Sequence, residues 1–261
     1  MRRIVTVCAI LIGLLAGCGG RDAVNDATPE PLALITEAAN KIRASNTFRL
    51  YVEQTGATYR FQVYLDEART NLVTAGFEFA RAQYVAPDML QATTRIVVET
   101  PLGNLAQDVD IFSRGLEQWY RLASLPWIKG DFAPGFNPVT LIADDSGFQA
   151  ALTALVDLQF VGNVTLEDGS PTYHLKGIAN GPAIKGLVVG LINFAETVPV
   201  EVFVHRETGY PVRLILTQPE TITEQEPVPT TWTIDVFDVD EPAELTPPEA
   251  AAQPSAEAEG S

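Results

Sequence analysis

The stretch Phe48-Arg49-Leu50-Tyr51-Val52-Glu53 decides the fold class of this 261-residue chain. Successive side chains of an extended strand point to opposite faces, so one face of this stretch is apolar and carries Phe48, Leu50 and Val52. The stretch from Arg60 to Leu65 repeats the alternation, and its apolar face carries Phe61, Val63 and Leu65. Gly56 predicts a turn between the two runs, which are therefore expected to pair as a hairpin.

The same alternation continues outward along the chain. It predicts weaker strands over 71–75 and 77–85, divided at Gly76, and further strands around 95–99, 108–111, 119–122, 160–166, 173–178, 200–204, 212–216 and 232–236. The candidate inward-facing residues of the later strands include Ile96, Val98, Val202, Leu214 and Leu216. Strands that are apolar on one face only are typical of an antiparallel sheet with one covered face.

Helical spacing of apolar residues interrupts the strands at three places. It predicts a helix from Leu32 to about Ser45, and a second one that starts at Asp145 or Ser146 and carries Phe148, Leu152, Leu155 and Val156. The segment 183–195 is the most apolar of the domain and includes Leu187, Val188 and Leu191; it is too short to span a bilayer and is expected to form a buried or interfacial helix. Asn137 is expected to cap a short helix that begins at Pro138.

Strands and helices do not alternate as βα units, so a parallel sheet is not expected. The order of elements predicts an α+β fold, a large curved antiparallel half-barrel sheet with helices on its concave face. The loop 125–132 carries Trp127 and Phe132 and has two interpretations. It contacts a membrane or a ligand at a pocket mouth, or it folds over the sheet with Trp127 as a plug.

The N-terminal residues predict export. Residues 1–17 have a basic start, a short apolar run and a small-residue end, which is typical of a signal peptide. Leu15-Ala16-Gly17-Cys18 resembles the lipobox of bacterial lipoproteins, which implies that Cys18 is lipidated and becomes the mature N-terminus. The alternatives are an ordinary secretory signal and a membrane anchor. Residues 18–31 are expected to form the lipidated cysteine and a flexible tether, 32–240 a single domain, and 241–261 a disordered acidic tail.

Composition excludes several function classes. The formal charge of −16 becomes −18 when Arg2 and Arg3 leave with the signal, so the protein is not expected to bind nucleic acid. Its two cysteines are Cys8, inside the signal, and Cys18, so no disulfide is expected in the domain. The two histidines, His174 and His205, have no metal-ligand spacing, and no nucleophile elbow or phosphate-binding glycine loop occurs. The sequence predicts no catalytic residue, no metal and no cofactor.

Several stretches carry a family resemblance: Tyr84-Val85-Ala86-Pro87-Asp88, the turn from Gly115 to Trp119-Tyr120, Phe136-Asn137-Pro138 with Leu141-Ile142-Ala143-Asp144, Gly147-Phe148, and Val198 to Gly209 with Arg213. In this order they resemble the LppX/LprA/LprF/LprG lipoprotein family, itself similar to the LolA/LolB carriers and RseB. The resemblance implies an apolar cavity between sheet and helices. It also implies a monomer that binds acylated lipid or glycolipid, is held on the extracytoplasmic side of the cell membrane by Cys18, and moves lipid within the envelope.

Two interpretations of the apolar strand faces stay open. They line a lipid cavity, or they fill a solid core, in which case the same scaffold would serve a protein-binding or envelope-sensing lipoprotein. The candidate cavity residues are Phe48, Leu50, Val52, Phe61, Val63, Leu65, Ile96, Val98, Leu152, Leu155, Leu187, Val188, Leu191, Val202, Leu214 and Leu216.

Overall fold

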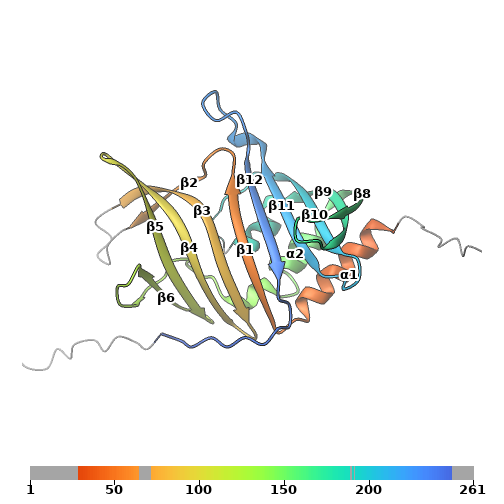
Figure 1. Ribbon diagram of the computed structural model, residues 1–261, viewed down its shortest axis with the longest axis horizontal. Helices are drawn as coiled ribbons and strands as arrows, with labels where there is room; N and C mark the ends of the chain where they lie inside the picture. Colours follow the sequence, from red (N-terminus) through yellow and green to blue (C-terminus); the bar gives the residue numbers. More distant parts are fainter. Residues whose placement is uncertain (1–28, 65–71, 189, 191, 249–261) are drawn as a thin grey trace, which may run out of the picture.

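The computed structural model describes residues 29–64, 72–188, 190 and 192–248 of the chain. The predicted signal, Cys18, most of the tether and the end of the acidic tail lie outside these residues. The described part is one curved sheet with helices packed on its concave side (Figure 1). None of its helices is long and apolar enough to cross a membrane.

The sheet has twelve strands, all paired antiparallel in the order β7-β6-β5-β4-β3-β1-β12-β11-β10-β9-β8, with β2 beside β3. Their bounds are β1 Thr47–Thr55, β2 Arg60–Tyr64, β3 Leu72–Val85, β4 Met89–Thr100, β5 Gly103–Arg114, β6 Glu117–Leu122, β7 Ile128–Lys129, β8 Val156–Thr165, β9 Pro171–Asn180, β10 Thr197–His205, β11 Pro211–Gln218 and β12 Thr230–Phe237. The predicted α+β class and curved antiparallel sheet are confirmed.

The predicted hairpin between the first two strands is wrong. β1 lies between β3 and β12, and β2 pairs only with the first half of the 14-residue β3. The chain turns at Gly56, but this turn is held against the β11–β12 connection, because Ala57 N donates to Val228 O at 2.9 Å and the Thr230 hydroxyl donates to Ala57 O at 2.6 Å. A Cβ on Gly56 would lie 2.0 Å from Pro229 O, so glycine is required there.

The predicted break at Gly76 is a register shift between Phe77 and Phe79 inside a continuous β3. Such a bulge bends a strand without ending it. The predicted loop 125–132 contains the short β7, which pairs with β6. Arg121 holds Trp127 beside that strand, with its guanidinium carbon 4.6 Å from the centre of the indole ring.

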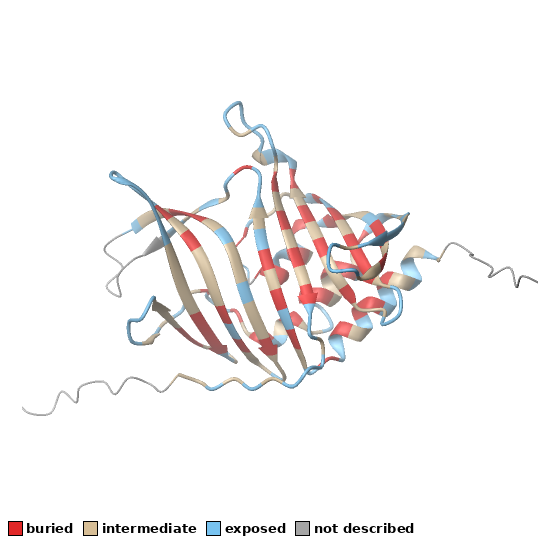
Figure 2. Cartoon of the chain, viewed as in Figure 1, coloured by how far each residue is buried: buried red, intermediate tan, exposed pale blue. Residues whose placement is uncertain are grey.

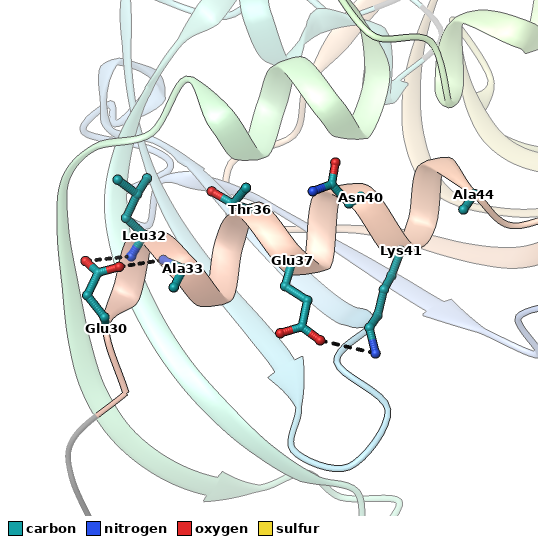
Figure 3. A pocket seen from close by; sticks show the side chains of 8 residues that line it. All are labelled: Glu30, Leu32, Ala33, Thr36, Glu37, Asn40, Lys41 and Ala44. Atoms are coloured by element: carbon teal, nitrogen blue, oxygen red, sulfur yellow. Dashed lines mark hydrogen bonds and ion pairs between the residues drawn. The ribbon is translucent and has the colours of Figure 1, made fainter.

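Helix α1 (Pro31–Arg43) follows the predicted spacing and buries Ile35, Ala38, Ala39 and Ile42. The carboxylate of Glu30 accepts hydrogen bonds from Leu32 N and Ala33 N and so caps the first turn (Figure 3). On the outer face Lys41 Nζ lies 3.3 Å from Glu37 Oε1, as the four-residue spacing predicts. Helix α2 (Gly147–Thr153) is shorter than predicted, since Val156 already begins β8. Asn137 caps the 3₁₀ turn η1 (Pro138–Leu141) as expected.

The predicted buried or interfacial helix over 183–195 is wrong. It is replaced by one turn of α-helix, α3 (Gly181–Ile184), and one turn of 3₁₀-helix, η2 (Lys185–Val188). Gly190 adopts a φ of +73°, a left-handed conformation that stops a helix. A Cβ on Gly186 would lie 3.0 Å from Gly147 N, so this glycine lets η2 approach the start of α2.

Arginine–carboxylate pairs lie along the convex face. Arg95 binds both carboxylate oxygens of Asp108, at 2.7 and 2.9 Å, and Arg121 Nε lies 2.8 Å from Asp110 Oδ2. The hydrogen bond from Arg95 lowers the pKa of Asp108, and hydrogen bonds from Lys129 and Arg114 lower the pKa of Glu117.

These lowered pKa values predict acid sensitivity. A carboxyl with a depressed folded-state pKa stabilises the fold above its unfolded pKa, and the contribution is lost as the pH falls through the folded value, below roughly pH 4. The double variant D108N/E117Q should therefore lose less stability than the wild type between pH 7 and pH 3. Urea midpoints at the two pH values measure this. An equal drop for both proteins would show that these pairs do not contribute.

Candidate functional site

Two rows of side chains across the sheet form the floor of a pocket on the concave face. Strand register places the first row side by side: Leu50, Ala82, Ala92, Ile111, Tyr120 and Ile128. A second, parallel row lies two residues away on each strand and consists of Val52, Ala80, Thr94, Val109 and Leu122. Every one of these residues lines the pocket. Three alanines, Ala80 and Ala82 of β3 and Ala92 of β4, lie in the middle of the two rows. Their small side chains leave space above these strands, whereas the neighbouring strands carry larger side chains.

Aromatic side chains close the floor at both ends of the strands. At one end Phe48 stacks on Tyr84, with 4.8 Å between ring centroids, and Phe148 of α2 meets the edge of Phe48 at 5.9 Å. Burial raises the pKa of Tyr84 to about 12, so its hydroxyl stays protonated and donates to Pro87 O at 2.8 Å. At the other end Trp232 packs against Tyr59 and Phe77, at 5.5 and 5.2 Å.

The roof comes from two connecting segments. One contributes Phe132 and Leu141, and the other contributes Leu187, Val188 and Ile192. The first is fixed by Gln118, whose side chain donates to Ala133 O at 2.7 Å and accepts from Ala133 N at 3.0 Å. The second is held by Asn193, whose N–H donates to the Tyr59 hydroxyl at 3.0 Å and whose carbonyl accepts from Gln218 Nε2 at 3.1 Å. The two roof segments are thus tied to the sheet and do not collapse onto the floor.

The pocket is partly open and has a volume of about 470 Å³. Its lining is apolar except for the side chains of Gln62, Thr94, Lys129 and Asp131 and the hydroxyl groups of Tyr59 and Tyr120. The described residues contain no group of three or more His, Cys, Asp or Glu side chains that could hold a metal ion. Such a space suits an apolar ligand, because it offers a water-poor surface and few groups that could polarise a reacting bond.

The concave face is open over one half of the sheet, around β3 to β5, and covered over the other half, around β8 to β12. Helix α1 contacts β8, β10 and β11, and with α2 and α3 it covers that half of the concave face. Buried side chains recur along β10, β11 and β12, whereas partly buried and exposed ones together outnumber them along β3 to β5 (Figure 2). The helices fill the space over β8 to β12, whereas in the described residues the two roof segments cover the space over β3 to β5.

This division separates the sequence-predicted cavity residues into two groups. Those that line the pocket are Leu50, Val52, Phe61, Ile96, Leu187 and Val188. Those that lie instead in packed core are Phe48, Val98, Leu152, Leu155, Val202, Leu214 and Leu216. The concave face of the sheet is apolar on both sides of this division. The alternation of side chains is therefore the same on both sides, and the position of the covering helices determines where the space is filled. Val63 lies opposite Val73 in the β2–β3 pair, and Leu65, Leu191 and Cys18 fall outside the described residues.

Sequence reasoning missed the small residues of the floor. Ala80, Ala82 and Ala92 line the pocket, but alanine is too small to stand out in an alternating apolar pattern. The sequence does contain an indication of these residues. Ala80-Arg81-Ala82 in β3 alternates like the other strands, but it has alanine where a packed strand would carry valine or leucine. It also missed Ile128, which extends the first row of the floor, whereas Phe132 lies in the roof and belongs to the loop that was predicted to contact a ligand mouth or to cover the sheet.

A second hollow, with a volume of about 650 Å³ and wide open to solvent, lies on the outer side of α1. It is a shallow surface groove between Glu30 and Ala44, and Figure 3 shows the polar side chains of the helix along it. It does not reach the concave face. We therefore take the pocket under the roof segments as the candidate functional site.

The family model described as LppX_LprAFG lipoprotein matches residues 30–244. The chain belongs to this family. Two crystal structures of relatives show the same fold. LprF from Mycobacterium bovis superposes with a TM-score of 0.55 at 12% identity, covering 85% of this chain and 99% of that one. LppX from Mycobacterium tuberculosis gives a TM-score of 0.52 at 17% identity, covering 84% of this chain and all of the other. None of the curated protein sequences matches this chain.

Proposed function

We propose that this LppX_LprAFG lipoprotein binds acylated lipid or glycolipid in the concave pocket and carries it, as a monomer, within the cell envelope. The supporting observation is the pocket itself, an apolar space held open by hydrogen bonds between its roof and the sheet. Burial of each methylene group from water is worth about 0.8 kcal/mol, so shape and apolarity alone suffice to bind a hydrocarbon chain. No catalytic group takes part.

The pocket volume sets the capacity. A volume of about 470 Å³ lies within the usual range of small-molecule pockets, about 300–1,000 Å³. One long acyl chain would fill the space, and further chains of a multi-acylated lipid would extend along the open concave face. The polar head group would lie near Lys129 and Asp131 or in solvent.

The anchor belongs to the same proposal. Lipidation of Cys18 would hold the protein at the extracytoplasmic face of the cell membrane, and residues 18–31 would give the domain reach. The net negative charge does not favour adsorption on anionic lipid, so attachment would depend on the covalent lipid and on apolar contacts.

Lipid that co-purifies with the protein tests the proposal. The mature chain from residue 19, secreted without its anchor, should release acylated lipid on extraction with organic solvent, close to one molecule per protein by mass spectrometry. Acyl lipid is expected because only hydrocarbon matches the lining. A lipid-free preparation that also takes up no fatty acid would overturn the proposal and favour a partner-binding role for the same scaffold.

A further inference from the structure

The apolar floor of the pocket continues beyond it along β4 and β5. Ile96 and Val98 share the concave face of β4, and the register places Gln107 and Leu105 of β5 opposite them. Ala75, Ile96 and Val98 form a small buried cluster, with Phe61 packed against it. The one polar side chain of this strip, Gln107, turns its amide to Asp108 O at 2.9 Å. A strip of buried apolar side chains, which we call the track, therefore joins the pocket floor to the β4–β5 turn. Ala75 is completely buried and Val98 is 4% exposed, so an acyl chain follows this strip only where these packed side chains move aside.

The track ends in exposed leucines. Leu105 is 58% exposed and Leu102, at the tip of the turn, is fully exposed at 101%. The tip has a fixed shape, since the Thr100 hydroxyl donates to Gly103 O at 2.6 Å and accepts from Leu102 N at 3.3 Å. Figure 1 shows this hairpin projecting from the rim of the sheet, and Figure 2 shows that its tip is exposed. We call residues 100–107 the lip.

The lip is uncharged in a strongly acidic protein. Residues 100–107 carry no ionisable side chain, although the chain has 33 Asp and Glu residues. The nearest carboxylate before it, Glu99, is paired with Arg60 at 2.8 Å. A charge-free apolar hairpin can enter the hydrocarbon boundary of a bilayer at little desolvation cost, whereas the acidic surface around it would be repelled by anionic lipid.

We infer that the lip is the surface that docks on a lipid bilayer, and that acyl chains pass between bilayer and pocket along the β4–β5 track. This inference rests on the proposed function. A lipid bilayer is the expected partner because the exposed leucines are continuous with the pocket lining. One apolar path would then join the bilayer to the bound chain. The passage involves no covalent step.

Transfer between vesicles tests the inference. The full lipidated protein, reconstituted in phosphatidylcholine donor vesicles, is mixed with acceptor vesicles and a pyrene-labelled fatty acid, and the rate of pyrene transfer is followed. The variants are L102D alone and L102D/L105D. Leu116, 68% exposed at the β5–β6 turn, which lies at the other end of β5, gives the matched control L116D. Each lip variant should slow transfer at least about tenfold, the effect of withdrawing a leucine from hydrocarbon, while L116D stays near wild type.

A second measurement separates the lip from the pocket. Equilibrium binding of the labelled fatty acid as a monomer in solution, without vesicles, should be unchanged in the lip variants, because Leu102 does not line the pocket. Wild-type transfer rates in L102D/L105D, or an equal loss in L116D, would overturn the inference and leave the proposed function standing. Wild-type protein that binds no monomer would overturn the proposed function and the lip with it.

Discussion

The double variant A82F/A92F should lose lipid binding and at the same time become more stable. Ala82 and Ala92 are direct cross-strand partners on the pocket floor, with Leu50 and Ile111 on either side. Two phenyl rings at these positions would occupy the space of the bound chain. Exclusion of only four methylene groups costs about 3 kcal/mol, which weakens affinity more than about 100-fold.

The stability should move in the opposite direction, because the new rings enter open space rather than a filled core. Filling a cavity commonly adds about 0.5–2 kcal/mol to the free energy of unfolding. Fatty-acid titration and thermal unfolding of lipid-free protein measure the two effects. The matched control is Q91F, which places the same side chain on β4 but on the exposed outer face, and it should bind lipid normally. Retained binding in a folded A82F/A92F protein would contradict the assignment of the pocket.

The alternation of side chains was sufficient to predict the sheet. Phe48, Leu50 and Val52 in β1, and Val200, Val202 and Val204 in β10, all face the concave side that the pattern indicates. The pairing of β1 with β2 failed because pairing depends on a remote contact, the fit of Gly56 against Pro229. A turn residue shows where the chain bends but not which strand it meets next.

The pocket could be predicted only in part for a similar reason. Leu50 and Leu214 lie on the same concave face and look alike in the sequence, yet Leu50 borders open space and Leu214 is packed. The difference arises from α1 and α2, which are long enough to cover half of the sheet. The hollow half depends on Gln118 and Gln218, two buried amides inside strands, whose role in holding the roof segments requires the three-dimensional structure.

Trp232→Ala should destabilise the lipid-free fold by about 3–5 kcal/mol, the usual cost of removing a large buried aromatic side chain. Trp232 is completely buried and stands where the packed half of the sheet meets the pocket. Its ring packs on Tyr59 and Phe77. The decrease should appear as a lower urea midpoint of unfolding. A matched control is Trp127→Ala, which removes a partly exposed indole beneath Arg121 and should cost no more than about 1 kcal/mol.

Trp232→Phe separates packing from hydrogen bonding at the same position. The indole Nε1 donates to Gln218 Oε1 at 2.7 Å, and the amide nitrogen of Gln218 holds Asn193 of the roof. Phenylalanine keeps most of the ring but leaves this buried oxygen without its donor, so the variant should lose about 1–3 kcal/mol. It should also bind fatty acid more weakly, because Gln218 is free to turn away from the roof segment. If Trp232→Phe matched the wild type in both stability and binding, the hydrogen-bonded link from β12 to the roof would not hold the pocket open, and apolar contacts alone would have to explain its shape.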